Sequence, residues 1–468
     1  MESQKTNRRD FLKVAAGTVG AGVAVASGLG AGVKASAATP SVRTQAVESS
    51  GTMWGLNYAP HVQAYHRMAD LFKKKYGSTI TVQPQPYGYT NLIAALAAGT
   101  QPDVVCQNGQ LISALVLQGA LMEIRDSVYK YNKTWPWQTY FVGDAVVPFS
   151  LGDKIYGIPL ETDGGLGSAV NVPVDAVKKA GLAHKYPPTN GQEFFSSFDE
   201  LFSLAKALQV TQNGKVKRWG LCGEGWDLAT IGGMMYTMGV APFVEEKGQF
   251  NFNTPAGIRA MQLHAETPVK MGIEKEWNDA SAVIDEALNG NAAITLANGA
   301  PTTFGKQYGY DYEGAGMPKI DGKTPQAFGE GQGWGIIGPI KSQHPNLQLA
   351  FLRMMDTREG QYAYDLTYGG VNVVAWKDIL LHDTSRFHPA NNSNPQYVSA
   401  KKPLTNLVLE NAHYIGRAGY IDRVDAAIFT ACQSVRLGKL NSAQAMAKVQ
   451  QACEAQYRQY KIDLSNLQ

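Results

Sequence analysis

Two short segments of the sequence carry acidic residues in pairs. Glu161 and Asp163 are separated by one residue, and Glu224 and Asp227 by two. Carboxyl groups of this kind can act as a general acid and as a base or nucleophile on a glycosidic bond. They can equally accept hydrogen bonds from the hydroxyls of a bound sugar without any reaction. Because a sequence does not give the distance between carboxyl groups, both chemistries stay open.

Aromatic residues are the second group that could contact a ligand, because a flat apolar face can stack on a ring. The chain has 8 Trp and 22 Tyr, and each of them could instead be part of the core. Trp226 is the strongest candidate for a ligand contact, since Gly223, Gly225 and Asp227 around it are typical of a loop. Trp54 lies within a predicted strand, and we expect it to be structural.

Residues for metal, nucleotide or covalent chemistry do not form a recognisable motif. His61 and His66 are five positions apart and lie on different faces of a predicted helix, which disfavours a metal pair. The glycine-rich run 329–335 contains no G-x-G-x-x-G, and the sequence has no P-loop and no G-x-S-x-G. The cysteines show no C-x-x-C, and spacing alone does not decide whether Cys432 and Cys453 form a disulfide. We therefore expect no metal and no cofactor.

The composition is that of a globular protein with more than one core. The chain has 468 residues, of which 44% are hydrophobic and 17% charged. This length exceeds what one hydrophobic core usually supports, which predicts two domains or lobes. Lys and Arg number 42 against 39 Asp and Glu. A balance so close to neutral argues against a broad basic surface for nucleic acids.

The first 37 residues resemble a twin-arginine export signal. Arg8-Arg9 precedes a weakly apolar, glycine-rich stretch at 14–33, and Ala35-Ser36-Ala37 fits the small-x-small pattern of a cleavage site. We predict export by the twin-arginine translocase and cleavage after Ala37. The segment carries five basic and two acidic residues, so the mature chain has 37 of each. We expect that mature chain to be soluble and periplasmic or extracellular.

The mature chain alternates short strands with amphipathic helices. Strands are predicted at 52–56, 79–83 and 103–105, and helices at 61–76, 90–98 and 111–117. Such alternation predicts a parallel sheet and an α/β fold. Ligands bind beyond the carboxyl ends of the strands in sheets of this kind. That rule points to the residues that follow these strands, which are Asn57, Tyr58, Tyr87 and the segment 108–110 with Gln110.

A second block of elements follows the segment 155–160. Helices are predicted at 198–208, 282–288 and 347–355, a strand at 292–296, and a long last helix after Ser442. One stripe of that helix, which we expect to pack in the core, consists of Met446, Val449, Cys453, Tyr457 and Tyr460. No flexible linker separates the two blocks, so ordered segments should cross between them.

Several short motifs resemble those of extracellular solute-binding protein family 1, and they occur in the family's order. Residues 97–105 (AAGTQPDVV) resemble the signature AG-x-x-PDV. The other matching segments are Gly119-Ala120-Leu121, Gly157-Ile158-Pro159, Lys179-Ala180-Gly181-Leu182, 290–294, 333–336, His344-Pro345 and Gly438 with 443–447. One departure is Ser168-Ala169-Val170-Asn171, which replaces the usual Y-Y-N. The resemblance spans about residues 52–460.

The resemblance implies a two-lobed α/β fold of the type II periplasmic-binding-protein class, with a mixed, mainly parallel sheet in each lobe. The first lobe would comprise 50–159 and 330–375, and the second 160–329 and 376–468. Pro159 and the run 331–335 would mark the crossings. Hinge motion could then close the two lobes on a ligand.

Members of that family are receptors of ABC importers, mostly for sugars. The resemblance therefore implies a monomeric, non-enzymatic receptor that binds a mono- or oligosaccharide between its lobes and delivers it to membrane permease subunits. A neutral sugar suits a mature chain without net charge. The alternative is a secreted carbohydrate-active enzyme, a hydrolase or lyase, that uses a carboxylate pair. A weaker alternative is an exported binding protein for a peptide or an organic acid. A binder of an acid would need Arg or Lys in the cleft, and the candidate segments contain few.

The ligand-binding residues that we predict combine the strand-end positions with the acidic and aromatic candidates. They are Asn57, Tyr58, Tyr87, Gln110, Glu161, Asp163, Trp226, Asn298, Trp334 and Tyr420.

Overall fold

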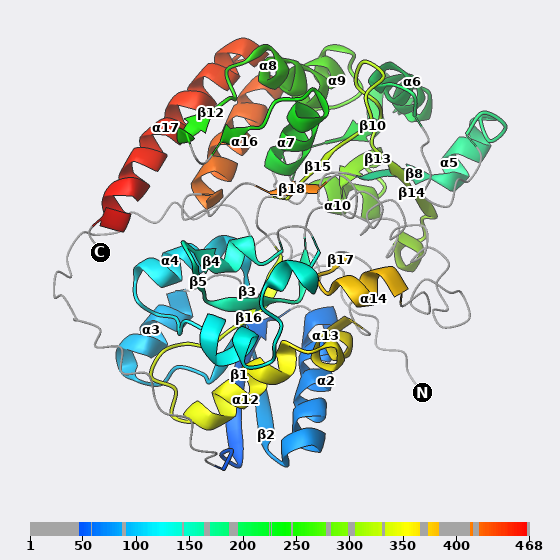
Figure 1. Cartoon of the computed structure of the whole chain (residues 1–468). Helices are drawn as coiled ribbons and strands as arrows, with labels where there is room; N and C mark the ends of the chain where they lie inside the picture. The colour runs from blue at the N-terminus through cyan, green and yellow to red at the C-terminus, as the bar shows by residue number, and fades with distance from the viewer. Residues whose placement is uncertain are drawn as a thin grey trace, which may run out of the picture.

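The structure is a computed structural model. It describes residues 46–57, 59–86, 90–142, 145–162, 169–186, 195–223, 225, 227–244, 247–277, 282–297, 305–329, 333–365, 373–382, 412–414 and 421–465. The chain forms two lobes, one above the other in Figure 1, and each lobe is built around its own sheet. None of the helices within the described ranges combines the length and apolarity that a membrane crossing requires.

The sheet of the first lobe has the strand order β2-β1-β3-β16-β6. Its strands are β1 (Ser50–Leu56), β2 (Thr79–Gln85), β3 (Val104–Asn108), β6 (Gly157–Pro159) and β16 (Trp334–Ile337). Strand β1 pairs in parallel with β2 and β3, whereas β16 runs antiparallel to β3 and β6. The predicted strand–helix alternation at the start of the chain is confirmed, and it places the carboxyl ends of β1, β2 and β3 at one edge.

Helices cover both faces of this sheet, because consecutive strand residues point to opposite faces. Val104 and Cys106 pack with one core cluster, and Val105 between them packs with another. The first cluster includes side chains of α2 (Ala59–Tyr76) and α12 (Pro345–Met355), and the second those of α3 (Thr90–Ala98) and α4 (Ile112–Leu117). Helix α13 (Arg358–Asp365) lies beside α2 (Figure 1).

The sheet of the second lobe has the order β14-β8-β13-β10-β9. Its strands are β8 (Ala169–Pro173), β9 (Val210–Gln212), β10 (Lys215–Cys222), β13 (Ala292–Ala297) and β14 (Tyr312–Gly316). Strands β10 and β13 are parallel, and the other pairings are antiparallel. The sheet is therefore mixed, as predicted, but mainly antiparallel, so the prediction of a mainly parallel sheet in each lobe is wrong for this lobe. Helices around this sheet are α5 (Val174–Lys179), α6 (Phe198–Leu208), α7 (Asp227–Thr237), α8 (Pro255–Met261), α9 (Thr267–Lys270), α10 (Ala282–Leu288), α16 (Ile421–Arg436) and α17 (Ser442–Ser465).

One large hydrophobic cluster forms the core of the second lobe. It includes Leu204 of α6, Ile231 of α7 and Ile428 of α16. The predicted stripe of the last helix is part of it: Met446, Val449 and Cys453 are buried, and Tyr457 packs against the cluster. The side chain of Tyr460 lies outside the described residues.

Shorter elements connect and decorate the two sheets. They are β4 (Ser150–Leu151), β5 (Lys154–Ile155), β7 (Glu161–Thr162), β11 (Phe243–Val244), β12 (Gln249–Phe250), β15 (Ala327–Gly329), β17 (Val373–Val374), β18 (Ala412–Tyr414), α14 (Lys377–His382), the 3-10 turns η2 (Gly109–Leu111), η4 (Trp137–Thr139), η5 (Val147–Phe149) and η8 (Gly305–Tyr308), and the π-helices η3 (Arg125–Lys130) and η7 (Gln262–Glu266).

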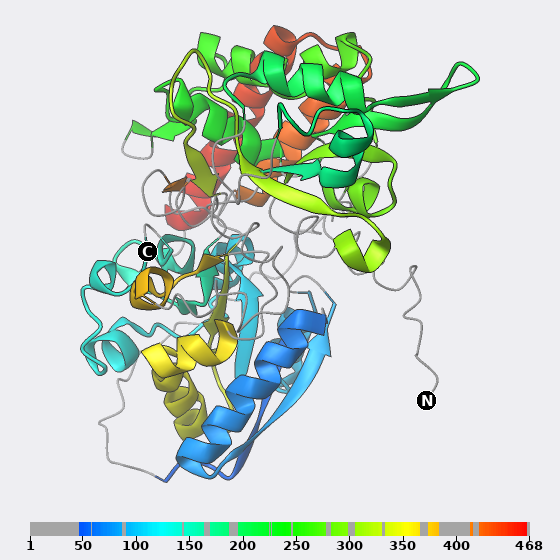
Figure 2. The ribbon, with the colours of Figure 1, turned by 90° about the vertical axis from the view of Figure 1, so that its right-hand side faces the viewer.

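The chain crosses between the lobes more than once. It passes from the first sheet to the second between β6 and β8, and it returns between β14 and β16. Backbone hydrogen bonds tie the crossing region together, because Leu160 N–H donates to Trp334 O and Ala375 N–H to Leu160 O. Trp376 and Ile379 pack in the first-lobe core, a few residues beyond position 375. Figure 2 shows the two lobes from the side.

Candidate functional site

A hollow lies at the carboxyl edge of the first sheet, where the sequence rule for parallel strands placed the site. The side chains and backbone around it come from the ends of β1, β2 and β3, from the start of α3 and from β16. The lining residues are Trp54, Gly55, Leu56, Gln85, Pro86, Asn91, Leu92, Val105, Cys106, Gln107 and Trp334.

Neutral amides are the polar groups of this hollow. Asn91 Nδ2 donates a hydrogen bond of 3.2 Å to Gln85 Oε1. Gln107 Oε1 accepts one of 2.9 Å from the N–H of Asn108. None of the described residues that line the hollow carries a charge. Amides offer both donors and acceptors, which suits hydroxyl groups better than ions.

Trp54 lines the hollow and also packs against the core cluster that includes side chains of α3 and α4, which agrees with the structural role expected of it. Met53 before it is fully buried, whereas Trp54 on the opposite face of β1 is only partly buried. Its Nε1–H donates a hydrogen bond of 2.7 Å to Gln83 Oε1 of β2. The strand pattern alone could not separate these two faces, because helices cover both of them. The indole therefore has a fixed orientation and an accessible surface.

Trp334 lies deeper than Trp54, and only 7% of its surface is exposed. It sits at the start of β16, opposite Asn108 at the end of β3. The edge of its ring system meets the imidazole of His61 with 4.8 Å between centroids. Burial lowers the pKa of His61 to about 3, so this imidazole is neutral at physiological pH. The imidazole that packs against Trp334 therefore adds no charge to the hollow.

Glu161 is buried in the crossing region, with 2% of its surface exposed. It begins β7 and pairs with Val374 of β17. Its Oε2 accepts a hydrogen bond of 3.2 Å from the hydroxyl of Tyr364, a residue of the first-lobe core. The carboxylate is thus integrated into the first lobe beneath the crossing.

Asn57 and Gln110 lie at the edge where they were predicted. Asn57 is exposed, and its N–H continues the β1–β2 pairing by donating to Gln85 O at 2.8 Å. Gln110 belongs to η2, which contacts α16 of the second lobe. Leu117 and Leu151 of the first lobe also pack against the second-lobe core. Gln110 therefore stands where the two lobes meet.

Six of the predicted ligand-binding residues lie outside the described residues. They are Tyr58, Tyr87, Asp163, Trp226, Asn298 and Tyr420. The same holds for Glu224, one of the four acidic residues with which the sequence analysis began.

The second lobe contains a buried ionic cluster that the sequence analysis missed, apart from naming Asp227 as an acidic residue. Asp227 Oδ1 lies 2.5 Å from His264 Nε2 and 3.2 Å from Arg436 Nη1. Arg436 Nε is 3.8 Å from Glu274 Oε1. All four side chains have no exposed surface or almost none. Asp227 begins α7, five positions after the last residue of β10, Cys222.

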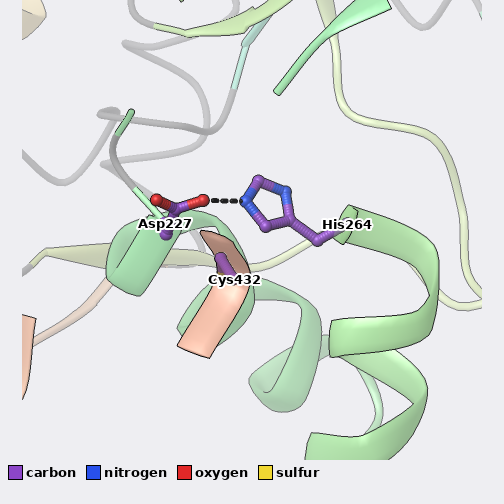
Figure 3. Close-up of side chains that lie close together, drawn as sticks. All are labelled: Asp227, His264 and Cys432. Carbon is purple, nitrogen blue, oxygen red and sulfur yellow. Dashed lines mark hydrogen bonds and ion pairs between the residues drawn. The ribbon is translucent and has the colours of Figure 1, made fainter. Parts of the chain in front are cut away.

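Three of the buried side chains in this region could in principle hold a metal ion. Ligand atoms of Asp227, His264 and Cys432 lie within 4.8 Å of one another, and Figure 3 shows Asp227 and His264 joined directly by a hydrogen bond. Arg436, however, contacts both the carboxylate and the imidazole. A cation placed there would stand beside a guanidinium, which does not lose its charge in proteins. The geometry therefore fits an ionic cluster better than a metal site.

The four cysteines are free thiols in the structure, and all of them are buried. The Cys432–Cys453 disulfide, which the sequence left open, is not formed. Cys432 Sγ instead contacts Met261 Sδ at 3.7 Å.

Comparison with known families gives one match. Residues 58–362 match the family model described as bacterial extracellular solute-binding protein, which covers more than half of the chain. No curated protein sequence matches the chain.

Several solved structures share the fold across both lobes. The cyclic alpha-maltosyl-1,6-maltose binding protein from Arthrobacter globiformis has a TM-score of 0.67 and 16% identity, with 88% of this chain and 99% of that chain covered. The maltose/maltodextrin-binding domain MalE from Bdellovibrio bacteriovorus, bound to maltotriose, has a TM-score of 0.65 and 16% identity, covering 87% and 100%. An ABC transporter solute-binding protein from Thermotoga lettingae, bound with alpha-D-tagatose, has a TM-score of 0.65 and 17% identity, covering 88% and 100%. These similarities confirm the predicted type II periplasmic-binding-protein fold.

Proposed function

The chain belongs to the bacterial extracellular solute-binding protein family, and on that premise we propose that it binds a neutral carbohydrate between its lobes and delivers it to an ABC importer. The observation that carries the proposal is the hollow at the carboxyl edge of the first sheet. It combines the accessible indole of Trp54 with the amides of Gln85, Asn91 and Gln107, and its described lining has no charge. An aromatic face with neutral donors and acceptors is what a sugar requires.

The ligands of structurally similar proteins suggest which carbohydrates to consider. The neighbours' printed descriptions name tagatose and ribitol as well as maltotriose and maltotetraose. We propose a ligand within this range, from a single sugar to a short oligosaccharide. The six predicted residues outside the described ranges complete the site in this proposal, together with Asn57, Gln110, Glu161 and Trp334.

The proposed function also implies how the chain is divided into lobes and how these lobes move. We propose a first lobe of 50–159 and 330–375 and a second lobe of 160–329 and 376–468, with a hinge near Pro159 and 331–335. The packing of Leu160, Trp376 and Ile379 in the first-lobe core shifts both boundaries by a few residues, so that these residues belong to the first lobe. Two separate cores and ordered crossing segments support this division. Closure of the lobes would bury the ligand and present a joint surface to the permease subunits. The exported protein would act as a monomer, after cleavage behind Ala37.

We propose binding without turnover. Glycosidases need two carboxyl groups about 5 to 9.5 Å apart on either side of the scissile bond. Glu161 bonds to Tyr364 in the first-lobe core, and Asp227 belongs to the cluster of the second lobe. Each is buried in its own lobe and already engaged, so these two do not offer such a pair.

A pair of matched ligands tests the uncharged hollow. The mature protein would be titrated with maltotriose, tagatose and ribitol, and with the charged analogue of maltotriose in which the terminal sugar is oxidised to a carboxylate. We expect at least one neutral compound to bind. We expect the affinity for oxidised maltotriose to be at least tenfold lower than the affinity for maltotriose. Preference for the charged analogue would contradict the proposal.

A further inference from the structure

Four titratable side chains converge inside the second lobe from four separate places in the chain. Asp227 comes from the first turn of α7 and His264 from the π-helix η7. Glu274 follows α9, and Arg436 is the last residue of α16. Their exposed fractions are between 0% and 4%. One guanidinium thus faces two carboxylates and an imidazole in the buried interior of the lobe.

Hydrogen bonds join this cluster into one unit. Asp227 Oδ1 lies 2.5 Å from His264 Nε2, so His264 donates from Nε2, because a carboxylate can only accept. Arg436 Nη1 donates to the same oxygen at 3.2 Å. Burial lowers the pKa of His264, although the carboxylate of Asp227 acts in the opposite direction. A neutral imidazole that donates to Asp227 agrees with that direction.

The cluster also holds the backbone at the end of β10. The N–H of Gly223 donates to Glu274 Oε1 at 2.5 Å. A side chain at position 223 would meet His264, Glu274 and Arg436 at 3.4 to 3.6 Å, so the glycine lies directly against the cluster. Two residues later Gly225 has φ of 153°, a conformation that favours glycine. Its carbonyl accepts a hydrogen bond of 2.6 Å from Asp227 N–H.

Stability alone does not account for such an arrangement. Buried ion pairs often contribute less to stability than apolar residues of the same volume would, because the charges lose their hydration. The position of the cluster suggests a different role. It holds the carboxyl end of β10 through Gly223 and the start of α7 through Asp227, and the carboxyl ends of parallel strands are where ligands bind.

We propose that Asp227, His264, Glu274 and Arg436 are positioning residues that fix the ligand-facing edge of the second lobe. Glu274 sets the position of Gly223, and His264 with Arg436 sets the position of Asp227, so that these two residues keep a fixed relative position. This proposal rests on the proposed function, because it assigns that edge to the ligand. It adds that residues without access to the ligand control affinity.

Matched pairs of variants separate positioning from stability. His264→Gln keeps a donor where Nε2 stands, whereas His264→Leu removes it. Glu274→Gln keeps an acceptor for Gly223 N–H, whereas Glu274→Leu removes it. Glu276→Gln is the control, since Glu276 lies on the same segment and its contact is with Gln433, 3.4 Å away. Arg436→Lys tests the guanidinium, because an ammonium cannot bridge two carboxylates in the same way.

Two measurements are made on mature protein at a temperature well below unfolding. The first is amide hydrogen exchange at Gly223 and Asp227 without ligand, and the second is affinity for the most tightly bound member of the panel of maltotriose, tagatose and ribitol. We expect both leucine variants to exchange at least tenfold faster at these amides and to bind at least tenfold more weakly. The glutamine variants and Glu276→Gln should stay within about threefold of the unmodified protein in both.

Each result decides the proposal in one direction. Folded leucine variants with unchanged affinity would show that the cluster is only structural and would overturn it. If the leucine variants do not fold, Arg436→Lys decides: a tenfold loss of affinity supports positioning, and unchanged affinity overturns it. If the unmodified protein binds no member of the panel, the proposed ligand class fails. Hydrogen exchange alone then tests whether the cluster positions the backbone. An unchanged exchange rate at the Gly223 amide in the variants would show that Glu274 does not hold Gly223 in place.

Discussion

The indole N–H of Trp54 on β1 donates a hydrogen bond of 2.7 Å to Oε1 of Gln83 on the neighbouring strand β2. This bond fixes the ring plane at the edge of the hollow before any ligand arrives. A side chain that is already ordered loses less entropy on binding than a free one. In the site that we propose, Trp54 is therefore the described residue best placed to stack on a sugar ring.

Replacing Trp54 by alanine should weaken carbohydrate binding about tenfold or more. A stacked aromatic contact contributes about 0.5–1.5 kcal/mol beyond area burial, and 1.4 kcal/mol corresponds to one decade in affinity. Trp54→Phe retains a flat ring and should cost less. Trp135→Ala is the control, because Trp135 is 39% exposed and does not line the hollow. Calorimetric titration measures all three, and equal affinities for Trp54→Ala and Trp135→Ala would exclude Trp54 from the site.

Asp356 should make the first lobe less stable as the pH rises. Its side chain is fully buried, and burial raises its pKa to about 7. Oδ2 accepts hydrogen bonds from Thr134 and Asn132, but Oδ1 has no partner among the described residues. Because the folded pKa lies above the unfolded value of about 3.9, folding favours the protonated form. The associated stability is complete below about pH 4 and is lost as the pH rises through 7.

Asp356→Asn removes this titration while keeping the shape of the side chain. We expect the variant to exceed the unmodified protein in free energy of unfolding by about 1–4 kcal/mol at pH 8. At pH 4 the two proteins should differ little. Denaturant unfolding at the two pH values measures the effect, and a difference that does not depend on pH would show that folding does not raise the pKa of Asp356.

The thiols should be unreactive until the protein unfolds. All four cysteines are buried, and burial raises the pKa of Cys106 and Cys453, the latter to about 12. The reactive thiolate is therefore scarce as well as inaccessible. A maleimide or a disulfide reagent should label no cysteine in the native protein and four in denaturant without reductant. Two labelled cysteines in denaturant would reveal a disulfide between the other two.

Export should depend on the arginine pair. Arg8→Lys with Arg9→Lys removes the feature by which the twin-arginine route recognises its substrates. We expect the double variant to remain in the cytoplasm of a twin-arginine host and the unmodified chain to appear outside, beginning at Ala38. Fractionation and N-terminal sequencing check both points. Undiminished export of the double variant would refute the route.

The edge of the first sheet could be predicted from the sequence, because strands that alternate with helices must end on one side. Asn57 and Gln110 accordingly lie at that edge. Trp54 could not be assigned in the same way. Both faces of β1 are covered by helices, so an apolar residue on either face looks alike in the sequence, and only the packing shows which one reaches the hollow.

The ionic cluster of the second lobe could not be predicted from the sequence, for a different reason. Asp227 and Arg436 are 209 positions apart, and His264 and Glu274 belong to neither neighbourhood. A polar residue within an apolar helical pattern, such as His264 in η7, is the only local signal. The packing of α7, η7 and α16 decides which of these residues come into contact. A local sequence pattern does not predict this packing.

Calorimetric titration of the mature protein with maltotriose, tagatose and ribitol, followed by analysis of the same mixtures for products, tests the central claim most directly. The account predicts saturable binding of at least one of these compounds, with every compound recovered unchanged. Release of shorter products, abolished by Glu161→Gln or Asp163→Asn, or the absence of binding to any of the three, would contradict it.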